Sequence, residues 1–282
     1  MIWQCGRRTV NLRHEPAVMG IINTTPDSFS DGGQFSSVSE AIDFGLELAE
    51  AGADILDIGG ESTRPGAEPV SPQQEVRRIE PVIEGLRRHL NRPISIDTSK
   101  TTVARAALAA GANIINDITA LSGDPDMMEL AAESGAGVVL MHMQGTPQTM
   151  QKNPSYGDVI AEIGHYLRQR FEEAVNGGIH PECIVLDPGI GFGKTLEHNL
   201  EIFRRMHEWA DLPRPLLVGP SRKGFIGRIL DLPADQRLEG TAAAVTAAIL
   251  AGARIVRVHD VKVMKRVARM AAALSRWPTQ PT

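Results

Sequence analysis

Three acidic or amide side chains, Asp97, Asn116 and Asp187, stand at or near the ends of short apolar runs. Carboxylates so close to a buried core are unfavourable unless hydrogen-bond donors or a cation meet them. A flat heterocycle with an amidine-like edge offers adjacent N–H donors to a carboxylate, and an amide matches a mixed donor–acceptor edge. Lys223 could meet a carbonyl oxygen or a ring nitrogen of the same ring. The alternative is that Asp97 and Asp187 cap the helices that follow them.

Four basic side chains could form a site for an anion: Arg64, Lys223, Arg257 and His259. Arg257 and His259 are two residues apart in RVHD, so on a strand they would share a face. An arginine fork beside a histidine suits a phosphate. Because the net charge of the chain is −5, this cluster would be a local positive site. The alternative for such an arginine is a salt bridge at the surface.

The segment NTTPDSFSDGG, residues 23–33, follows an apolar run and carries many short oxygen-bearing side chains. Asn23, with Asp31 nearby, could hold Mg²⁺ through oxygen atoms, and Mg²⁺ commonly accompanies a diphosphate. Gly32 and Gly33 would permit a backbone change in this loop. From the residues alone, the segment also fits an ordinary turn-rich loop.

Eight short apolar runs, separated by amphipathic segments such as 39–52 and 101–111, must position these side chains. The runs are rich in Val, Ile and Leu without clean alternation, which is typical of strands buried on both faces of a parallel sheet. They cover residues 17–22, 54–59, 93–97, 113–117, 137–142, 183–187, 215–219 and 254–259. Eight strand–helix units in about 250 residues predict an α/β fold, a (β/α)8 TIM barrel, rather than an open doubly wound sheet.

A barrel also predicts where the chemistry lies, because the carboxyl ends of all its strands meet at one face. Nearly every apolar run ends in a polar or charged residue. Several helical segments end in Ala-Gly-Ala, where glycine suits a helix C-cap. Residues 2–12 could form a short β-hairpin over the opposite end. We predict one domain over 1–282, with an N-terminal hairpin in 1–15, the barrel in 16–276 and a tail in 277–282.

Composition narrows the classes of function. The 282 residues are 42% hydrophobic and 22% charged, as in an ordinary globular protein, and only 4% aromatic. Few aromatic residues and a negative net charge argue against a nucleic-acid-binding protein. No apolar run is long enough for a membrane span, and no secretory signal is visible. Cys5 and Cys183 have neither metal-ligand nor disulfide spacing, so we expect a reduced, cytoplasmic protein.

Two familiar motifs do not fit the sequence. DPGIGFGKT, residues 187–195, contains Gly-Lys-Thr, but Pro188 occupies the position where a phosphate-binding P-loop has its first glycine. Proline has no N–H for a phosphate, so we expect these glycines to bring the loop close to a ligand or to the next helix. The His-x-His pair of barrel zinc hydrolases is not found, and only His142 and His259 fall at strand ends.

Taken in order, these segments resemble bacterial dihydropteroate synthase over nearly the whole chain. The matching segments are MGIINTTPDSFSDGG, DIGGESTRPGA, ISIDTSK, IINDI, LMHMQGTP, LDPGIGFGK, VGPSRKGFIG and RVHDV. The resemblance implies a TIM barrel and a transferase of the alkyl- or aryl-transfer type. Such an enzyme joins 6-hydroxymethyl-7,8-dihydropterin diphosphate to p-aminobenzoate, giving 7,8-dihydropteroate and pyrophosphate in folate biosynthesis. We expect ionisation of the pterin before the amine attacks.

The resemblance also implies roles for individual residues. The pterin would bind Asp97, Asn116, Asp187, Lys223 and Arg257, in a pocket lined by Ile118, Met141, Phe192 and Gly219. The diphosphate would bind Asn23, Thr63, Arg64, Arg257 and His259, with Mg²⁺ on Asn23 and Asp31. The p-aminobenzoate would bind Phe29, Ser30, Pro65, Ser221 and Lys223, once the loops after the first two strands order over the substrate. The catalytic set would be Asp31, Arg64, Asp97, Lys223, Arg257 and His259, and a homodimer through the late helices is expected.

Other classes of protein are less consistent with the sequence. A corrinoid-linked methyltransferase also binds a folate pterin in a barrel, but it would not need the SFSDGG and STRPG segments. A non-catalytic pterin-binding paralogue should have lost the diphosphate cluster, which is present here. An interaction protein would depend on the alanine-rich segments near the C-terminus, which we expect to pack on the barrel.

Overall fold

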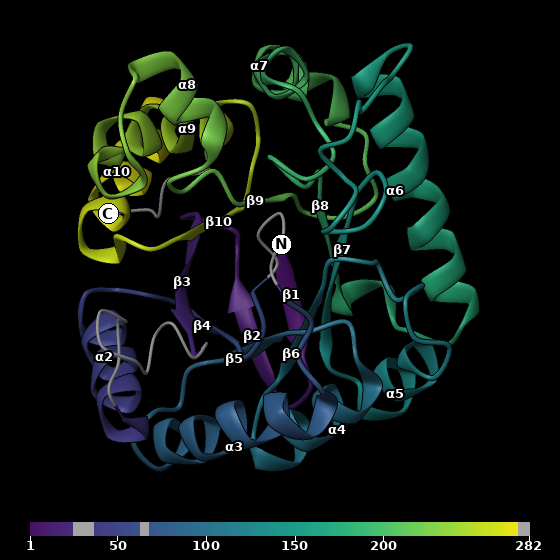
Figure 1. Ribbon diagram of the computed structural model, residues 1–282, viewed down its shortest axis with the longest axis vertical. Helices are drawn as coiled ribbons and strands as arrows, with labels where there is room; N and C mark the ends of the chain where they lie inside the picture. Colours follow the sequence, from purple (N-terminus) through teal and green to yellow (C-terminus); the bar gives the residue numbers. More distant parts are fainter. Residues whose placement is uncertain (25–36, 63–67, 276–282) are drawn as a thin grey trace.

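Eight parallel strands form a closed barrel in the computed structural model, which describes residues 1–24, 37–62 and 68–275 (Figure 1). The hydrogen-bonded order is β8-β7-β6-β5-β4-β3-β10-β9, and a parallel bridge between Leu186 and Leu216 joins the two ends. All eight predicted strands are confirmed, with ends within two residues of the predicted runs. Their bounds are β3 Ala17–Asn23, β4 Ile55–Gly59, β5 Ile94–Asp97, β6 Ile114–Asp117, β7 Gly137–Met141, β8 Ile184–Asp187, β9 Leu217–Val218 and β10 Ile255–Val258.

Helices surround the barrel and separate its strands along the chain (Figure 1). They are α2 Val38–Glu50, α3 Pro72–His89, α4 Thr101–Ala110, α5 Met127–Ser134, α6 Val159–Asn176, α7 Leu196–Arg205, α8 Gly224–Leu230, α9 Leu238–Leu250 and α10 Val261–Leu274, with short 3₁₀ turns at Pro181–Cys183, Met206–Trp209 and Ala234–Gln236. Gly111 caps α4 with φ +115°, so this predicted glycine C-cap is confirmed, whereas α2 and α9 are capped by Ala51 and Ala251, one residue before the predicted glycine. Among the described residues, no helix combines the length and apolar character needed to cross a bilayer.

Alternate residues of each strand face the inside of the barrel. In β4, Ile55 packs with inward residues of other strands, whereas Leu56 and Ile58 pack against the helices outside. Asp57 and Gly59 therefore share the inward face with Ile55, because side chains alternate along a strand. Both faces are buried, which explains why the strands read as continuous apolar runs.

The N-terminal hairpin fills the end of the barrel opposite the carboxyl ends of its strands. β1 (Ile2–Cys5) and β2 (Arg8–Asn11) pair antiparallel, as predicted. Trp3 is fully buried, and its Nε1 donates to the carbonyl oxygen of Cys183 at 2.7 Å. The hairpin packs in one cluster with inward residues near the amino ends of the strands: Trp3, Cys5, Val10, Leu12, Ala17, Met19, Ile55, Ile114, Val139, Val185, Leu217 and Ile255.

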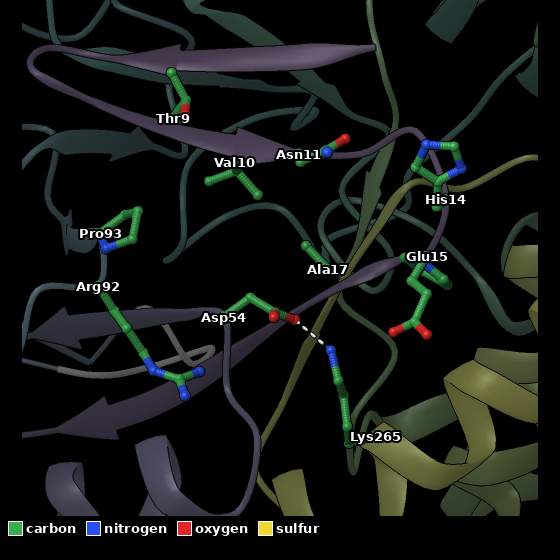
Figure 2. A pocket seen from close by; sticks show the side chains of 11 residues that line it. Thr9, Val10, Asn11, His14, Glu15, Ala17, Asp54, Arg92, Pro93 and Lys265 are labelled. Atoms are coloured by element: carbon green, nitrogen blue, oxygen red, sulfur yellow. Dashed lines mark hydrogen bonds and ion pairs between the residues drawn. The ribbon is translucent and has the colours of Figure 1, made fainter. Parts of the chain in front are cut away.

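A polar cavity of about 360 Å³ lies beside this hairpin, where β3, β4 and β5 begin (Figure 2). On one side of it, Asp54 accepts hydrogen bonds from Lys265 Nζ of α10 and from the Val18 N–H, each at 2.8 Å. These bonds tie α10 to the start of β3 and β4. The cavity belongs to the hairpin end of the barrel, away from the strand ends where chemistry is predicted.

The buried tryptophan should make the hairpin part of the barrel core. We expect Trp3→Ala to lower the free energy of unfolding by about 3–5 kcal/mol, because it removes a large, fully buried side chain. Ile2→Ala on the same strand is the control: Ile2 is 47% exposed, so its loss should change stability by less than about 0.5 kcal/mol. Urea unfolding of both variants measures this, and equal small effects would show that the hairpin is dispensable.

Candidate active site

Polar side chains at the carboxyl ends of neighbouring strands lie at one level of the barrel. Asn23 of β3 is in register with Gly59 of β4, Gly59 with Asp97 of β5, and Asp97 with Asn116 of β6. Gly59 leaves room between them, since a Cβ atom there would lie 3.7 Å from Asp97 Cβ and 3.8 Å from Asn23 Oδ1. Asp187 ends β8 further round the barrel. These predicted residues therefore line one mouth.

Arg257 of β10 crosses the inside of the barrel to carboxylates on two other strands. Its Nε donates to Asp57 Oδ2 at 2.6 Å, and its Nη2 donates to Asp97 Oδ2 at 2.7 Å. Asn116 Nδ2 donates to the same Asp57 oxygen at 3.2 Å. The Asp57 side chain is fully buried, and that of Arg257 is 20% exposed. The interpretation of Arg257 as a surface salt bridge is therefore wrong.

Burial makes the charged form of the mouth carboxylates unfavourable. It raises the pKa of Asp187 to about 6, although the Gly189 N–H, which donates to Asp187 Oδ1 at 2.7 Å, opposes the change. Burial also raises the pKa of Asp97; the Arg257 charge opposes this effect and the Asp57 charge adds to it. A ligand with N–H donors would restore the stabilisation that these carboxylates lost with their water.

Neither carboxylate caps the helix that follows it. α4 begins after Lys100, which makes no side-chain cap hydrogen bond. α7 begins after Thr195, whose Oγ1 accepts from the His198 N–H at 3.1 Å in a capping box. The helix-cap interpretation of Asp97 and Asp187 is therefore wrong.

The glycine-rich loop after β8 brings an aromatic ring next to Lys223. Gly189 has φ +66°, and a Cβ atom there would lie 2.0 Å from the carbonyl oxygen of His142. Only glycine permits this close approach to the loop after β7. Lys223 Nζ lies 4.1 Å from the centroid of the Phe192 ring, which is a cation–π contact. Lys223 and Phe192, both predicted to contact the pterin, thus lie together.

Lys194, the lysine of Gly-Lys-Thr, points back into the protein. It is 3% exposed, its Nζ lies 3.0 Å from His142 Nδ1, and it donates to the Phe192 carbonyl oxygen at 2.8 Å. Burial lowers the pKa of Lys194 to about 7 and that of His142 to about 3. Lys194 therefore holds the loop that carries Phe192, and its ammonium group is used inside the protein.

His259 lies next to Ser221 where β10 and β9 end. Its Nδ1 is 2.9 Å from Ser221 Oγ, and its backbone N–H donates to the same oxygen at 3.2 Å. Burial lowers the pKa of His259 to about 3, and the Arg257 and Arg222 charges add to this. The imidazole is therefore neutral near pH 7. The positive charge predicted for this cluster has to come from its arginine and lysine side chains.

A second ion cluster lies at the carboxyl ends of β4 and β5. Lys100 Nζ donates to Glu61 Oε2 at 2.8 Å, to Glu75 Oε2 at 2.7 Å and to the Val70 carbonyl oxygen at 2.8 Å. Glu61 Oε1 in turn accepts from the Val70 N–H at 2.8 Å. Glu61 and Val70, which stand on either side of residues 63–67, are thereby held together.

Six predicted site residues lie outside the described part of the chain: Phe29, Ser30, Asp31, Thr63, Arg64 and Pro65. Their roles, and that of the whole NTTPDSFSDGG loop beyond Thr24, stay predictions. Ile118 and Met141 are buried at the ends of β6 and β7, as a pocket lining requires.

Asp57 and Lys194 are central to the site and were not predicted from the sequence. Asp57 could have been found in the sequence, because it interrupts the apolar run ILDIG. It is also two residues from Gly59, so on a strand both residues face the inside of the barrel. No feature of the sequence indicates Lys194. A lysine after a glycine-rich loop is expected to be exposed, and only the fold shows that it is buried.

Comparison with known proteins identifies the family of the chain. The family model described as "Pterin binding enzyme" matches residues 19–259. A relative from Synechocystis, named dihydropteroate synthase, is 51% identical over 260 residues, which are 92% of this chain and 90% of the relative. The structure of Yersinia pestis dihydropteroate synthase with a sulfonamide drug complex is 43% identical, with TM-score 0.92 over 97% of this chain and 99% of that one. Xanthomonas albilineans dihydropteroate synthase with 4-aminobenzoic acid is also 43% identical, with TM-score 0.90 over 98% and 99%.

The raised pKa of Asp187 makes a prediction about stability. Because this pKa lies above the unfolded value of 3.8, the carboxyl stabilises the folded state at low pH, and that contribution is lost as the pH rises to about 6. Asp187→Asn keeps an acceptor for the Gly189 N–H and removes the charge. The stability of the variant relative to the wild type should therefore rise by about 2 kcal/mol between pH 4 and pH 8.

Urea unfolding at several pH values measures this difference. Asp235→Asn, the same replacement at an exposed aspartate, is measured alongside as the control. A constant difference for Asp187→Asn as well would mean that Asp187 is charged without cost in the folded protein.

Proposed function

The chain belongs to the dihydropteroate synthases within the pterin-binding enzymes, and on that premise we propose how its barrel mouth carries out the reaction. The reaction joins 6-hydroxymethyl-7,8-dihydropterin diphosphate to p-aminobenzoate and yields 7,8-dihydropteroate and pyrophosphate. The observation that carries the proposal is the combination of the buried Asp187 carboxylate and the Asp97 carboxylate, which is 12% exposed, with the Arg257 guanidinium at one mouth. The carboxylates suit a heterocycle with several N–H donors, and the guanidinium suits an anion.

The pterin binds deepest in the mouth. Asp97 and Asp187 accept its N–H groups, and both gain a partner that compensates for their burial. Asn116 and Lys223 meet the remaining polar atoms of the ring. Around them the pocket is lined by Ile118, Met141, Phe192 and Gly219.

The diphosphate binds toward the opening, next to Asn23, Thr63, Arg64, Arg257 and His259. Arg257 supplies a planar fork that fits phosphate oxygens. His259 supplies a neutral N–H donor, as its lowered pKa requires. The Arg257 side chain is only 20% exposed, so water screens its charge weakly.

Mg²⁺ is proposed to bind with the diphosphate. Asn23 presents an amide oxygen, a ligand type that suits Mg²⁺, and Asp31 would add a carboxylate. Among the described residues there is no cluster of three His, Cys, Asp or Glu side chains that could hold a metal alone. This fits an ion that takes most of its ligands from substrate and water. Bound Mg²⁺ would neutralise part of the charge on the diphosphate.

The p-aminobenzoate binds beside Phe29, Ser30, Pro65, Ser221 and Lys223. Lys223 contacts Phe192 on the pterin side and stands two residues after Ser221 in the segment that follows β9. A cation at this place suits the carboxylate of p-aminobenzoate. The proposal also implies that sulfonamides compete with p-aminobenzoate, as inhibitors of the same subsite.

The chemical step needs no protein nucleophile. The electron-rich dihydropterin stabilises positive charge as the CH₂–O bond breaks, and a charged Asp187 favours that charge. Arg257, with Arg64 and His259, stabilises the departing pyrophosphate, and the subsite places the aryl amine in line with the carbon. The amine then attacks and loses a proton.

The activity is tested by following pyrophosphate. With Mg²⁺, its release from the pterin diphosphate should depend on p-aminobenzoate and should match the dihydropteroate formed. Removal of Mg²⁺ with a chelator should stop release, and added Mg²⁺ should restore it. Tight pterin binding without release would contradict the proposed activity and point to a non-catalytic pterin-binding protein.

Arg257→Ala should lower kcat/KM for the pterin diphosphate by about 100-fold or more, because the leaving group loses a preorganised donor. Arg269→Ala on α10 is the matched control, since that side chain is 68% exposed. Steady-state kinetics with both variants measures the effect. Unchanged turnover in Arg257→Ala would rule out the mechanism above.

A homodimer through the late helices is also proposed. In support, large apolar side chains on α8, α9 and α10 are exposed, namely Ile229, Leu230, Leu250, Met270 and Leu274. Sedimentation equilibrium should give twice the chain mass of 30.5 kDa, and a charged residue in place of Leu250 or Met270 should reduce it to the monomer. A monomeric wild type would refute this assembly.

The buried free thiols of Cys5 and Cys183 fit the proposed location in the reducing cytoplasm.

A further inference from the structure

We propose that Asp57, which has no role in the reaction described above, is the positioning residue that orients both Arg257 and Asn116 toward the substrates. This inference rests on the proposed function, because those two side chains are assigned to the diphosphate and the pterin. Its basis is a single atom. Asp57 Oδ2 accepts from Arg257 Nε at 2.6 Å and from Asn116 Nδ2 at 3.2 Å.

The bond to Asp57 determines which edge of the Arg257 guanidinium is available to a ligand. The group has five N–H donors in one plane. The Nε hydrogen goes to Asp57 and one Nη2 hydrogen goes to Asp97. No other acceptor contacts Arg257 among the described residues, so both Nη1 hydrogens and the second Nη2 hydrogen remain. An anion with several oxygens, such as a diphosphate, matches this edge.

The same atom determines how the Asn116 amide is used. Its nitrogen donates to Asp57, so its carbonyl oxygen is the atom left for a ligand. Asn116 is 5% exposed and is in register with Asp97. The pocket therefore presents an amide oxygen and a carboxylate side by side. Such a pair accepts from neighbouring N–H groups of a heterocycle and would repel an edge of acceptors.

Asp57 itself is placed to act only through these two neighbours. Its side chain is fully buried, and its other oxygen, Oδ1, has no hydrogen-bond partner among the described residues. A buried carboxylate with an unpartnered oxygen destabilises a protein, and an apolar side chain of similar size would often be more favourable. Ile21, its register neighbour on β3, is an apolar residue buried at the same level of the barrel. The loss of stability caused by this buried carboxylate is explained if Asp57 orients the side chains that bind the substrates.

Asp57→Asn tests the proposal, because it keeps the shape and removes the charge. The probe is inorganic pyrophosphate with Mg²⁺, measured by calorimetry. We expect pyrophosphate to bind about 10- to 100-fold more weakly, by analogy with the loss seen when hydrogen-bond partners of metal ligands are removed. The kcat/KM for the pterin diphosphate should fall in parallel, and the KM for p-aminobenzoate should stay within about twofold.

Ser95→Ala provides the matched control. Ser95 is the register neighbour of Asp57 on β5, is fully buried, and its Oγ has no hydrogen-bond partner among the described residues. Its loss should leave both constants unchanged. If Ser95→Ala weakened pyrophosphate binding as much as Asp57→Asn, general disturbance of this level of the barrel would explain the result, and the proposal would fail.

A double-mutant cycle with Arg257→Gln shows whether Asp57 acts through the arginine. Once Arg257 is replaced, Asp57→Asn should change pyrophosphate affinity less than about twofold. Full additivity, or wild-type affinity in Asp57→Asn alone, would overturn the proposal. A wild type that binds pyrophosphate but forms no dihydropteroate would instead refute the proposed function and leave this result intact.

A measurement on the wild type covers the case in which Asp57→Asn does not fold. In ¹⁵N NMR, the Arg257 Nε–H should be protected from exchange and should remain so at saturating pyrophosphate, while the Nη signals shift. Loss of protection at Nε on addition of pyrophosphate would mean that Arg257 leaves Asp57 to bind the anion, which contradicts a positioning role.

Discussion

A guanidinium inside a barrel persists only if protein groups replace the water it has lost, and Arg257 imposes that condition on this structure. Asp57 of β4 and Asp97 of β5 satisfy it with hydrogen bonds of 2.6 and 2.7 Å. Because β3 lies between β10 and β4, the ion pairs connect strands that are not hydrogen-bonded neighbours. A shift of one residue in any of these strands would turn the charged side chains toward the helices. The pairing of the sheet and the charges at the mouth therefore depend on each other.

The barrel interior is divided into an apolar and a polar level. The apolar level includes the hairpin residue Trp3 and strand residues such as Ile55 and Leu217, all fully buried. The polar level above it can thus keep its charges out of contact with bulk water, which strengthens their interactions. Glycines make space at this level, for example Gly219, where a Cβ atom would lie 3.7 Å from Arg257 Cβ.

The sequence was sufficient to predict the barrel, because strands buried on both faces leave apolar runs that are easily recognised. It also predicted the mouth residues, since strand ends converge in this fold, and Asp97, Asn116 and Asp187 do line one opening. The sequence could not predict which carboxylates form ion pairs with Arg257. These ion pairs depend on distances across the barrel between residues far apart in the chain, such as Arg257 and Asp57, which are 200 positions apart.

The protonation states were equally hard to predict. His259 reads as a cation beside Arg257, yet burial lowers its pKa to about 3. Lys194 reads as an exposed lysine after a glycine-rich loop, yet it is 3% exposed and bonded to the Phe192 carbonyl oxygen. In both cases the exposure of the side chain to solvent decides its pKa. That exposure depends on tertiary packing and cannot be inferred from the neighbouring residues in the sequence.

The closure of the barrel also restricts the order in which the protein can form. β3, the first barrel strand, is hydrogen-bonded to β10, the last, with Ala17 opposite Ile255. During synthesis, β3 therefore has an open edge until residues 255–258 have left the ribosome. The hairpin also packs on Leu217 and Ile255. Its apolar side therefore stays partly uncovered until these residues have been synthesised. The newly made chain carries an unpaired strand and an uncovered apolar surface through most of its translation, which is the period in which a chaperone would be of use.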